Sequence, residues 1–150
     1  MTDERPAQQL EILKIYLKDA SFECPNAPLI FNEQGQPQIN VQLGSTTSPV
    51  DDNIHEVMLT LTVTAKSGEK TVYLVEVQQA GLFAIRGLSD EQLHHVLGAF
   101  CPNTLFPFAR EVLAALIGKG GFTPLLLNPV NFDALYLQRL QQEQQAETQH

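Results

Sequence analysis

The sequence is poor in cysteine and in positive charge, and each shortage argues against a class of function. Its 150 residues include only Cys24 and Cys101, which lie far apart and outside any metal-binding spacing. They predict reduced thiols, with neither a disulfide nor a metal site. The 9 basic residues are scattered singly beside 17 acidic ones, and the net charge is -8. Because no continuous basic surface can be drawn, the chain predicts no nucleic-acid partner.

Long apolar runs are also missing. No window reaches the length of a transmembrane helix, and the polar N-terminus lacks the apolar stretch of a signal peptide, so we expect a cytoplasmic protein that does not insert into membranes. Charged residues make up 17% of the chain, below the usual value of about a quarter, which favours an oligomer. The length fits one domain over residues 1–150, with flexible tails at residues 1–9 and about 143–150.

Strand patterns come first in the chain and helical patterns follow, which indicates the α+β class. Residues 45–53 have the composition of a loop, and the glycine link at Gly68 predicts a hairpin between the last two strands. The predicted strands cover residues 10–22, 38–43, 54–66 and 71–79, the last continuing towards Ile85. After the N-cap residue Ser89 the period becomes helical, and a last helix is expected to begin at Asn131.

A phenylalanine-rich segment lies at the centre of the helical half. Residues 98–111 read GAFCPNTLFPFARE, in which Pro102 and Pro107 predict a kinked helix over about 102–117. The kinks keep Phe100, Phe106 and Phe108 off one amphipathic stripe. Two interpretations stay open: the rings dock on another subunit or a ligand, or they fill the interior of the chain itself.

Catalytic patterns are not found in the sequence, so we predict a protein that is not an enzyme and needs no cofactor. The neighbours His94 and His95 diverge on a helix and lack the spacing of metal ligands. Asp19 and Glu23 are roughly 13 Å apart on a strand, too far for paired-carboxylate catalysis. With Glu76 they form either an acidic platform for a basic partner or a merely solvated face.

Four blocks of sequence closely resemble the SecB family of bacterial protein-export chaperones. They are KDASFECPNAP (18–28), EVQQAGLF (76–83), LGAFCPNTLFPFARE (97–111) and PVNFDAL (129–135), in the family's order and over nearly the whole chain. The resemblance implies a four-stranded antiparallel sheet followed by helices, assembled as a homotetramer that is a dimer of dimers. It also implies a chaperone that holds unfolded precursor proteins in apolar grooves and delivers them to the ATPase SecA.

The resemblance also implies roles for individual residues. The positions that match the SecA-binding surface are Asp19, Glu23, Leu74 and Glu76. Those that match the tetramer contacts are Val75, Val77 and Gln79. Candidates for the client groove are three aliphatic and five aromatic residues: Ile39, Val41, Leu43, Phe100, Phe106, Phe108, Phe132 and Tyr136. A tryptophan of the family is replaced around Gly35, and the chain contains none.

Strict alternation along the first strand would put Leu13, Ile15 and Leu17 on the face of Asp19 and Glu23. A bulge, or an apolar component of the acidic platform, is therefore expected. Two rival functions remain: an enzyme with a small-molecule pocket between sheet and helices, and a SecB-like chaperone dedicated to a toxin–antitoxin client.

Overall fold

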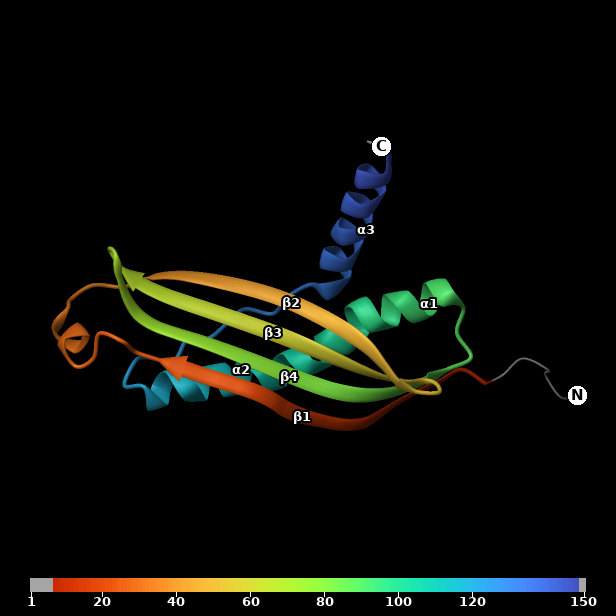
Figure 1. Ribbon diagram of the computed structural model, residues 1–150, viewed down its shortest axis with the longest axis horizontal. Coiled ribbons are helices and arrows are strands. Elements are labelled where there is room, and N and C mark those ends of the chain that lie inside the picture. The colour runs from red at the N-terminus through yellow and green to blue at the C-terminus, as the bar shows by residue number, and fades with distance from the viewer. Residues whose placement is uncertain (1–6, 149–150) are drawn as a thin grey trace, which may run out of the picture.

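A computed structural model describes residues 7–148 and shows one antiparallel sheet with the strand order β1-β4-β3-β2. Figure 1 shows the long strands side by side, with α2 (Cys101–Lys119) behind one face of the sheet and α3 (Phe132–Thr148) projecting away from it. The strands are β1 (Gln9–Glu23), β2 (Gln38–Asp51), β3 (Ile54–Ser67) and β4 (Lys70–Arg86). The four predicted strands, the hairpin at Gly68 and the continuation of the last strand past Gly81 are confirmed. β1 and β2 are the edges of the sheet.

The predicted loop over residues 45–53 is wrong, because most of it belongs to β2. Strand β2 pairs with β3 as far as Asp51 opposite Ile54, so the connection is a tight turn in which Asn53 has a φ of 60°. Composition misled here, since serine and threonine are common in loops as well as on edge strands. Pro49 is tolerated because an edge strand leaves one row of backbone positions without a ladder partner.

The helical half begins with α1 (Asp90–His95), directly after the predicted N-cap Ser89, which forms a capping box with Gln92. A π-helical turn, η2 (Val96–Phe100), joins α1 to α2 (Cys101–Lys119), and α3 (Phe132–Thr148) follows after an irregular segment. A short 3-10 helix, η1 (Leu29–Asn32), lies between β1 and β2. Helix α3 continues to Thr148, past residue 143, near which the sequence predicted a flexible tail. Residues 1–6 and 149–150, which belong to the two predicted tails, lie outside the described residues.

Helix α2 covers the face of β3 and β4 that we call the inner face; the opposite face is the outer face (Figure 1). A buried residue recurs every fourth position along α2, as a helix lying on a sheet requires. These residues are Cys101, Leu105, Ala109, Leu113 and Ile117. Each fully buried leucine of this layer contributes about 2 kcal/mol through the hydrophobic effect. The absence of a side chain at Gly81 lets Leu105 approach, since a Cβ there would lie 3.1 Å from Leu105 Cδ2.

The single helix α2 is too narrow to cover the whole inner face. Along β1 the inward-facing residues Leu10, Ile12 and Leu17 stay exposed, and along β2 Ile39 and Val41 do so. Both margins of the inner face therefore offer apolar side chains beside α2.

Candidate binding surfaces

The acidic residues singled out in the sequence lie together on the outer face. Glu23 pairs with Leu74, and Asp19 pairs with Gln78, which is two residues from Glu76 along β4. All four predicted SecA-binding positions, the three acids and Leu74, therefore share one face at the same end of the sheet. We call these four residues the acidic platform.

A β-bulge in β1 is what brings the acids to this face. The register shifts between Leu17, opposite Gln79, and Asp19, opposite Gln78. Since Gln79 faces inward and Gln78 outward, Leu17 joins the inner face while Asp19 and Glu23 join the outer one. The bulge expected from the sequence is confirmed, and an apolar component from Ile15 or Leu17 is not needed.

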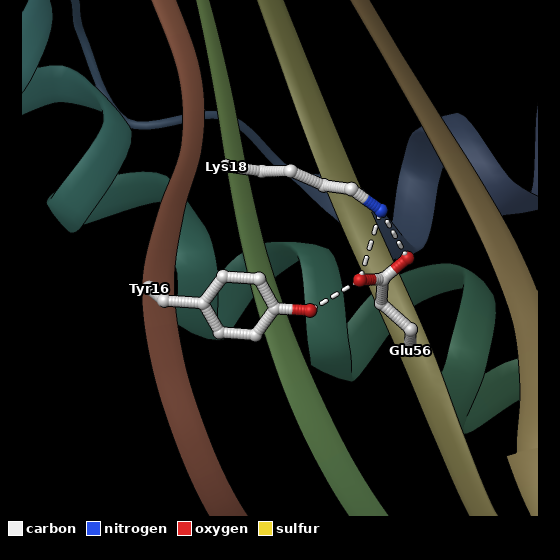
Figure 2. A network of polar contacts seen from close by, with 3 residues as sticks. All are labelled: Tyr16, Lys18 and Glu56. Carbon is white, nitrogen blue, oxygen red and sulfur yellow. Dashed lines mark hydrogen bonds and ion pairs between the residues drawn. The ribbon is translucent and has the colours of Figure 1, made fainter.

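The bulge residue Lys18 belongs to a polar network that crosses the outer face (Figure 2). Its Nζ donates to Glu56 Oε1 at 2.8 Å and to Oε2 at 3.0 Å, and the Tyr16 hydroxyl also donates to Oε2. These donors hold the pKa of Glu56 below its ordinary value, Lys18 first and Tyr16 second. Desolvation, with the nearby carboxylate, raises the pKa of Tyr16 to about 12. The ring of Tyr16 reaches across β4 at Ala80, whose small side chain is buried.

Glu76, by contrast, has only neutral hydrogen-bond donors among the residues that the structure describes. Thr62 Oγ1 donates to its Oε2 at 3.3 Å, and Gln78 Nε2 lies 3.5 Å from its Oε1. Within residues 7–148 no lysine, arginine or histidine forms an ion pair with Asp19, Glu23 or Glu76. The acidic platform thus keeps its negative charge uncompensated.

An aromatic pocket of ≈ 520 Å³ opens on the other side of the molecule, beyond the C-terminal end of α2. Three rings dominate its wall: Phe122 lies 5.2 Å from Phe31 and 5.2 Å from Tyr73, between ring centroids. Desolvation raises the pKa of Tyr73. The apolar residues that complete the lining include Ile30, Ile39, Val72 and Leu125. The pocket therefore joins η1, the beginning of β2, β4 and the segment that follows α2.

Polar contacts fix the segment that carries Phe31 to the β3–β4 hairpin. Asn26 Nδ2 donates to the carbonyl oxygen of Thr71 at 2.9 Å, and Lys70 Nζ lies 3.1 Å from Glu33 Oε1. A hydrogen bond from Ser67 and then the one from Lys70 lower the pKa of Glu33. Glu33 is thereby a carboxylate in the lining of the aromatic pocket, which also includes the polar residues Gln36, Ser67 and Thr123.

The predicted groove residues do not all reach this pocket. Only Ile39 lines it; Val41 and Leu43 follow on the same face of β2. Phe100 and Phe108 are about half exposed, and Phe100 lines a second cavity of ≈ 350 Å³ with Leu88 and Val96. The remaining three aromatic residues are buried in the chain's own core: Phe106, Phe132 and Tyr136. Of the three rings in the aromatic segment, Phe106 thus fills the interior of the chain itself, while Phe100 and Phe108 stay about half exposed.

The predicted tetramer positions are buried within the chain. Val75 and Val77 are fully buried on the inner face beneath α2, and Gln79 is 4% exposed. The Oε1 of Gln79 has no hydrogen-bond partner among the described residues. Any influence of these three residues on assembly would therefore pass through the helix that they support.

The histidine pair lies where α3 meets the rest of the fold. His94 Nδ1 is 2.5 Å from the Tyr136 hydroxyl, His95 stacks on the Tyr136 ring at 4.7 Å, and His95 Nε2 lies 2.9 Å from Asp133 Oδ1. The two rings do diverge, but Tyr136 fits between them. The ring also lies on Gly98, where a Cβ would be 2.6 Å from Tyr136 Cδ2.

The described part of the chain contains no cluster of three or more histidine, cysteine or acidic residues that could hold a metal ion. Burial raises the pKa of the Cys101 thiol to about 12, which disfavours the reactive thiolate. Over residues 7–148 no helix is both long enough and apolar enough to span a membrane.

Sequence reasoning missed most of the aromatic pocket, namely Ile30, Phe31, Tyr73 and Phe122. Phe31, in the one-turn helix η1, and Phe122, in an irregular segment, stand about 90 residues apart, where no period marks them as core. A usable signal was that each is a large apolar residue close to a proline and a glycine, in a segment without helical or strand spacing.

The fold defines the class of protein. A SecB-like chaperone from Mycobacterium tuberculosis, solved with a peptide from an antitoxin, has the same fold, with a TM-score of 0.66 over 81% of this chain and 90% of that chain at 17% identity. The fold is therefore that of the SecB-like chaperones.

Comparison of sequences narrows the class to a family. The family described as preprotein translocase subunit SecB matches residues 3–143. The protein-export protein SecB of Nitrosococcus oceani is 56% identical over 97% of this chain and 90% of its own, and that of Marinomonas sp. is 53% identical over 93% and 87%. The chain belongs to the SecB family of protein-export chaperones, as the sequence predicted. The alternative of a dedicated toxin–antitoxin client is not favoured, since the antitoxin complex comes from the far more distant relative.

Proposed function

We propose that this chain holds unfolded precursor proteins at the inner side of the sheet and hands them to SecA through the acidic platform on the outer face. One observation carries the proposal: the aromatic pocket and the acidic platform lie on opposite faces of one sheet. A client and a second partner can then bind together without competing for the same side chains. The chain works in the cytoplasm as a holder and makes or breaks no covalent bond.

The aromatic pocket supports the client role. Its rings and aliphatic side chains can receive many different apolar side chains, which suits a protein that must bind many sequences. The exposed residues Ile39 and Val41 on β2, Phe100 on η2 and Phe108 on α2 offer further apolar surface. Since an unfolded client loses much conformational entropy on binding, several weak contacts used together supply the affinity.

The acidic platform supports the SecA role. Asp19, Glu23 and Glu76 present negative charge around the apolar Leu74, an arrangement that attracts a basic segment and gives it one apolar contact. Attraction of this kind raises the association rate and weakens as salt screens it.

The exposed apolar margins of the inner face support assembly into a homotetramer that is a dimer of dimers. Leu10, Ile12 and Leu17 lie exposed along the edge strand β1 on the inner face of the sheet. Covering them with further copies of the chain would remove apolar surface from water. Val75, Val77 and Gln79 would act in assembly by supporting α2 from beneath.

The test exchanges one charge on the outer face. Glu76→Lys is expected to weaken SecA binding at least tenfold while arrest of a client's refolding stays as in the parent chain. Glu11→Lys is the matched control, because Glu11 pairs with Ala84 on the same face, about 27 Å further along β4. Equal losses of SecA binding and refolding arrest in Glu76→Lys would contradict separate surfaces.

A further inference from the structure

Lys18 is next to the acidic platform in the sequence, but its ammonium group points away from the platform. The β1 bulge turns both Lys18 and Asp19 towards the outer face, so the ammonium group has two sets of carboxylates within its reach. It contacts neither Asp19 nor Glu76 but both oxygens of Glu56 on β3. Figure 2 shows the Lys18 side chain extended across β4 towards that carboxylate, with Tyr16 approaching it from the same strand.

The strand register gives the separation that results. Asp19 pairs with Gln78 and Gln78 with Thr60, four residues from Glu56 along β3, which is about 13 Å. Glu76 pairs with Thr62, so its row is about 20 Å from Glu56. The Debye length at physiological ionic strength is about 8 Å, so an ammonium group held at Glu56 is largely screened from the platform. The same group beside Asp19 would cancel one of its three charges.

Glu56 can hold Lys18 because it is more sheltered than the competing carboxylate of Asp19. The Glu56 side chain is 18% exposed, whereas Asp19 is an exposed residue. The Tyr16 hydroxyl fixes one carboxylate oxygen and thereby orients the other for the ammonium group. Two charge-assisted hydrogen bonds to a partly buried carboxylate are stronger than a single contact with an exposed one.

We propose that Glu56, oriented by Tyr16, is a positioning residue that holds Lys18 off the acidic platform, so that the platform meets a basic partner with its full negative charge. This inference rests on the proposed SecA-binding function of the outer face. Glu56 itself need not touch SecA. Its effect is to decide where a neighbouring cation lies.

The test is a double-mutant cycle with full-length SecA as the probe and the intact chain in buffer of physiological ionic strength, about 0.15 M, at which the screening argument holds. Glu56→Gln is expected to weaken SecA binding about fivefold, because the released ammonium group turns to Asp19. Lys18→Met in the Glu56→Gln background is expected to restore binding to within about twofold of the parent chain. In the parent chain, where Glu56 is kept, Lys18→Met should strengthen SecA binding by a smaller factor than it does in the Glu56→Gln variant. Glu11→Gln, which removes one carboxylate of the same face without releasing a cation, is the matched control.

The outcomes separate this inference from the function on which it rests. If Glu76→Gln binds SecA as the parent chain does, the acidic platform is not the SecA site and both ideas fall. If Glu76→Gln weakens binding but Lys18→Met produces the same factor with and without Glu56, only net charge matters and Glu56 has no positioning role. Failure of the double variant to recover would show that Glu56 serves the sheet itself, and would likewise overturn the inference.

Discussion

The aromatic pocket predicts that Phe31 contributes to client binding far more than its neighbour Leu29, although Leu29 is the more exposed of the two. Phe31 is 49% exposed in the pocket wall, while Leu29 is 75% exposed on the same 3-10 helix and does not line the pocket. A phenylalanine offers about 200 Å², so the exposed half leaves about 100 Å² for a client to cover. At about 25 cal/mol per Å² this is at most about 2.5 kcal/mol. Incomplete contact reduces it to about 1–2 kcal/mol, or roughly tenfold in affinity.

The assay is titration calorimetry with a reduced and alkylated protein that cannot fold, used as the client. Phe31→Ala should weaken binding roughly tenfold, and Leu29→Ala should stay within about twofold of the parent chain. Thermal melting of each variant confirms that the fold is kept, since Phe31 also contacts Phe122 at 5.2 Å. If client binding follows total exposed apolar surface, Leu29→Ala will be the worse variant, and the reasoning about a defined pocket is refuted.

Three further predictions concern other parts of the fold. Gly98→Ala should lower the free energy of unfolding by about 1–3 kcal/mol and speed amide exchange in α3, because the new Cβ would lie 2.6 Å from the Tyr136 ring and loosen that contact. The control Gly44→Ala should change neither quantity, because its Cβ would have nothing within 4 Å. The buried Cys101 should resist alkylation at pH 8 until the chain is unfolded, and rapid modification of the native protein would contradict its burial. Folding lowers the pKa of Glu56, so the ionised Glu56 stabilises the fold at pH values above its ordinary pKa of 4.5, and this stabilisation is lost as the pH falls through the pKa of the folded state. Glu56→Gln should therefore flatten the acid side of a plot of unfolding free energy against pH. An acid side that is unchanged in the variant would refute this.

Periodic patterns in the sequence predicted most of the secondary structure. The alternation along β3 and β4 and the N-cap residue Ser89 predicted these elements because their local signals agree with their packing. The second half of β2 failed for the opposite reason. Its serine and threonine residues resemble a loop, and only the ladder with β3 makes them a strand.

The acidic platform was predictable, because the face of the sheet on which a residue lies decides its role there. The aromatic pocket was less predictable, because segments that are distant in the sequence meet in it. Alternation conflicted with the placement of Asp19, and that conflict alone indicated the bulge that the structure contains. The sequence could not show that Lys18 would reach Glu56, since that contact depends on register across β4. Nor could it bring Phe31 to Phe122, because only the tertiary fold joins η1 to the segment after α2.

The central claim is that client and SecA occupy opposite faces of one sheet. The most direct measurement is the affinity of SecA for the chaperone alone and for the chaperone saturated with an alkylated, unfolded client. The account predicts that the two affinities agree within about twofold and that a complex of all three proteins forms. If a saturating client displaces SecA from the chaperone, the two surfaces are one and the account is contradicted.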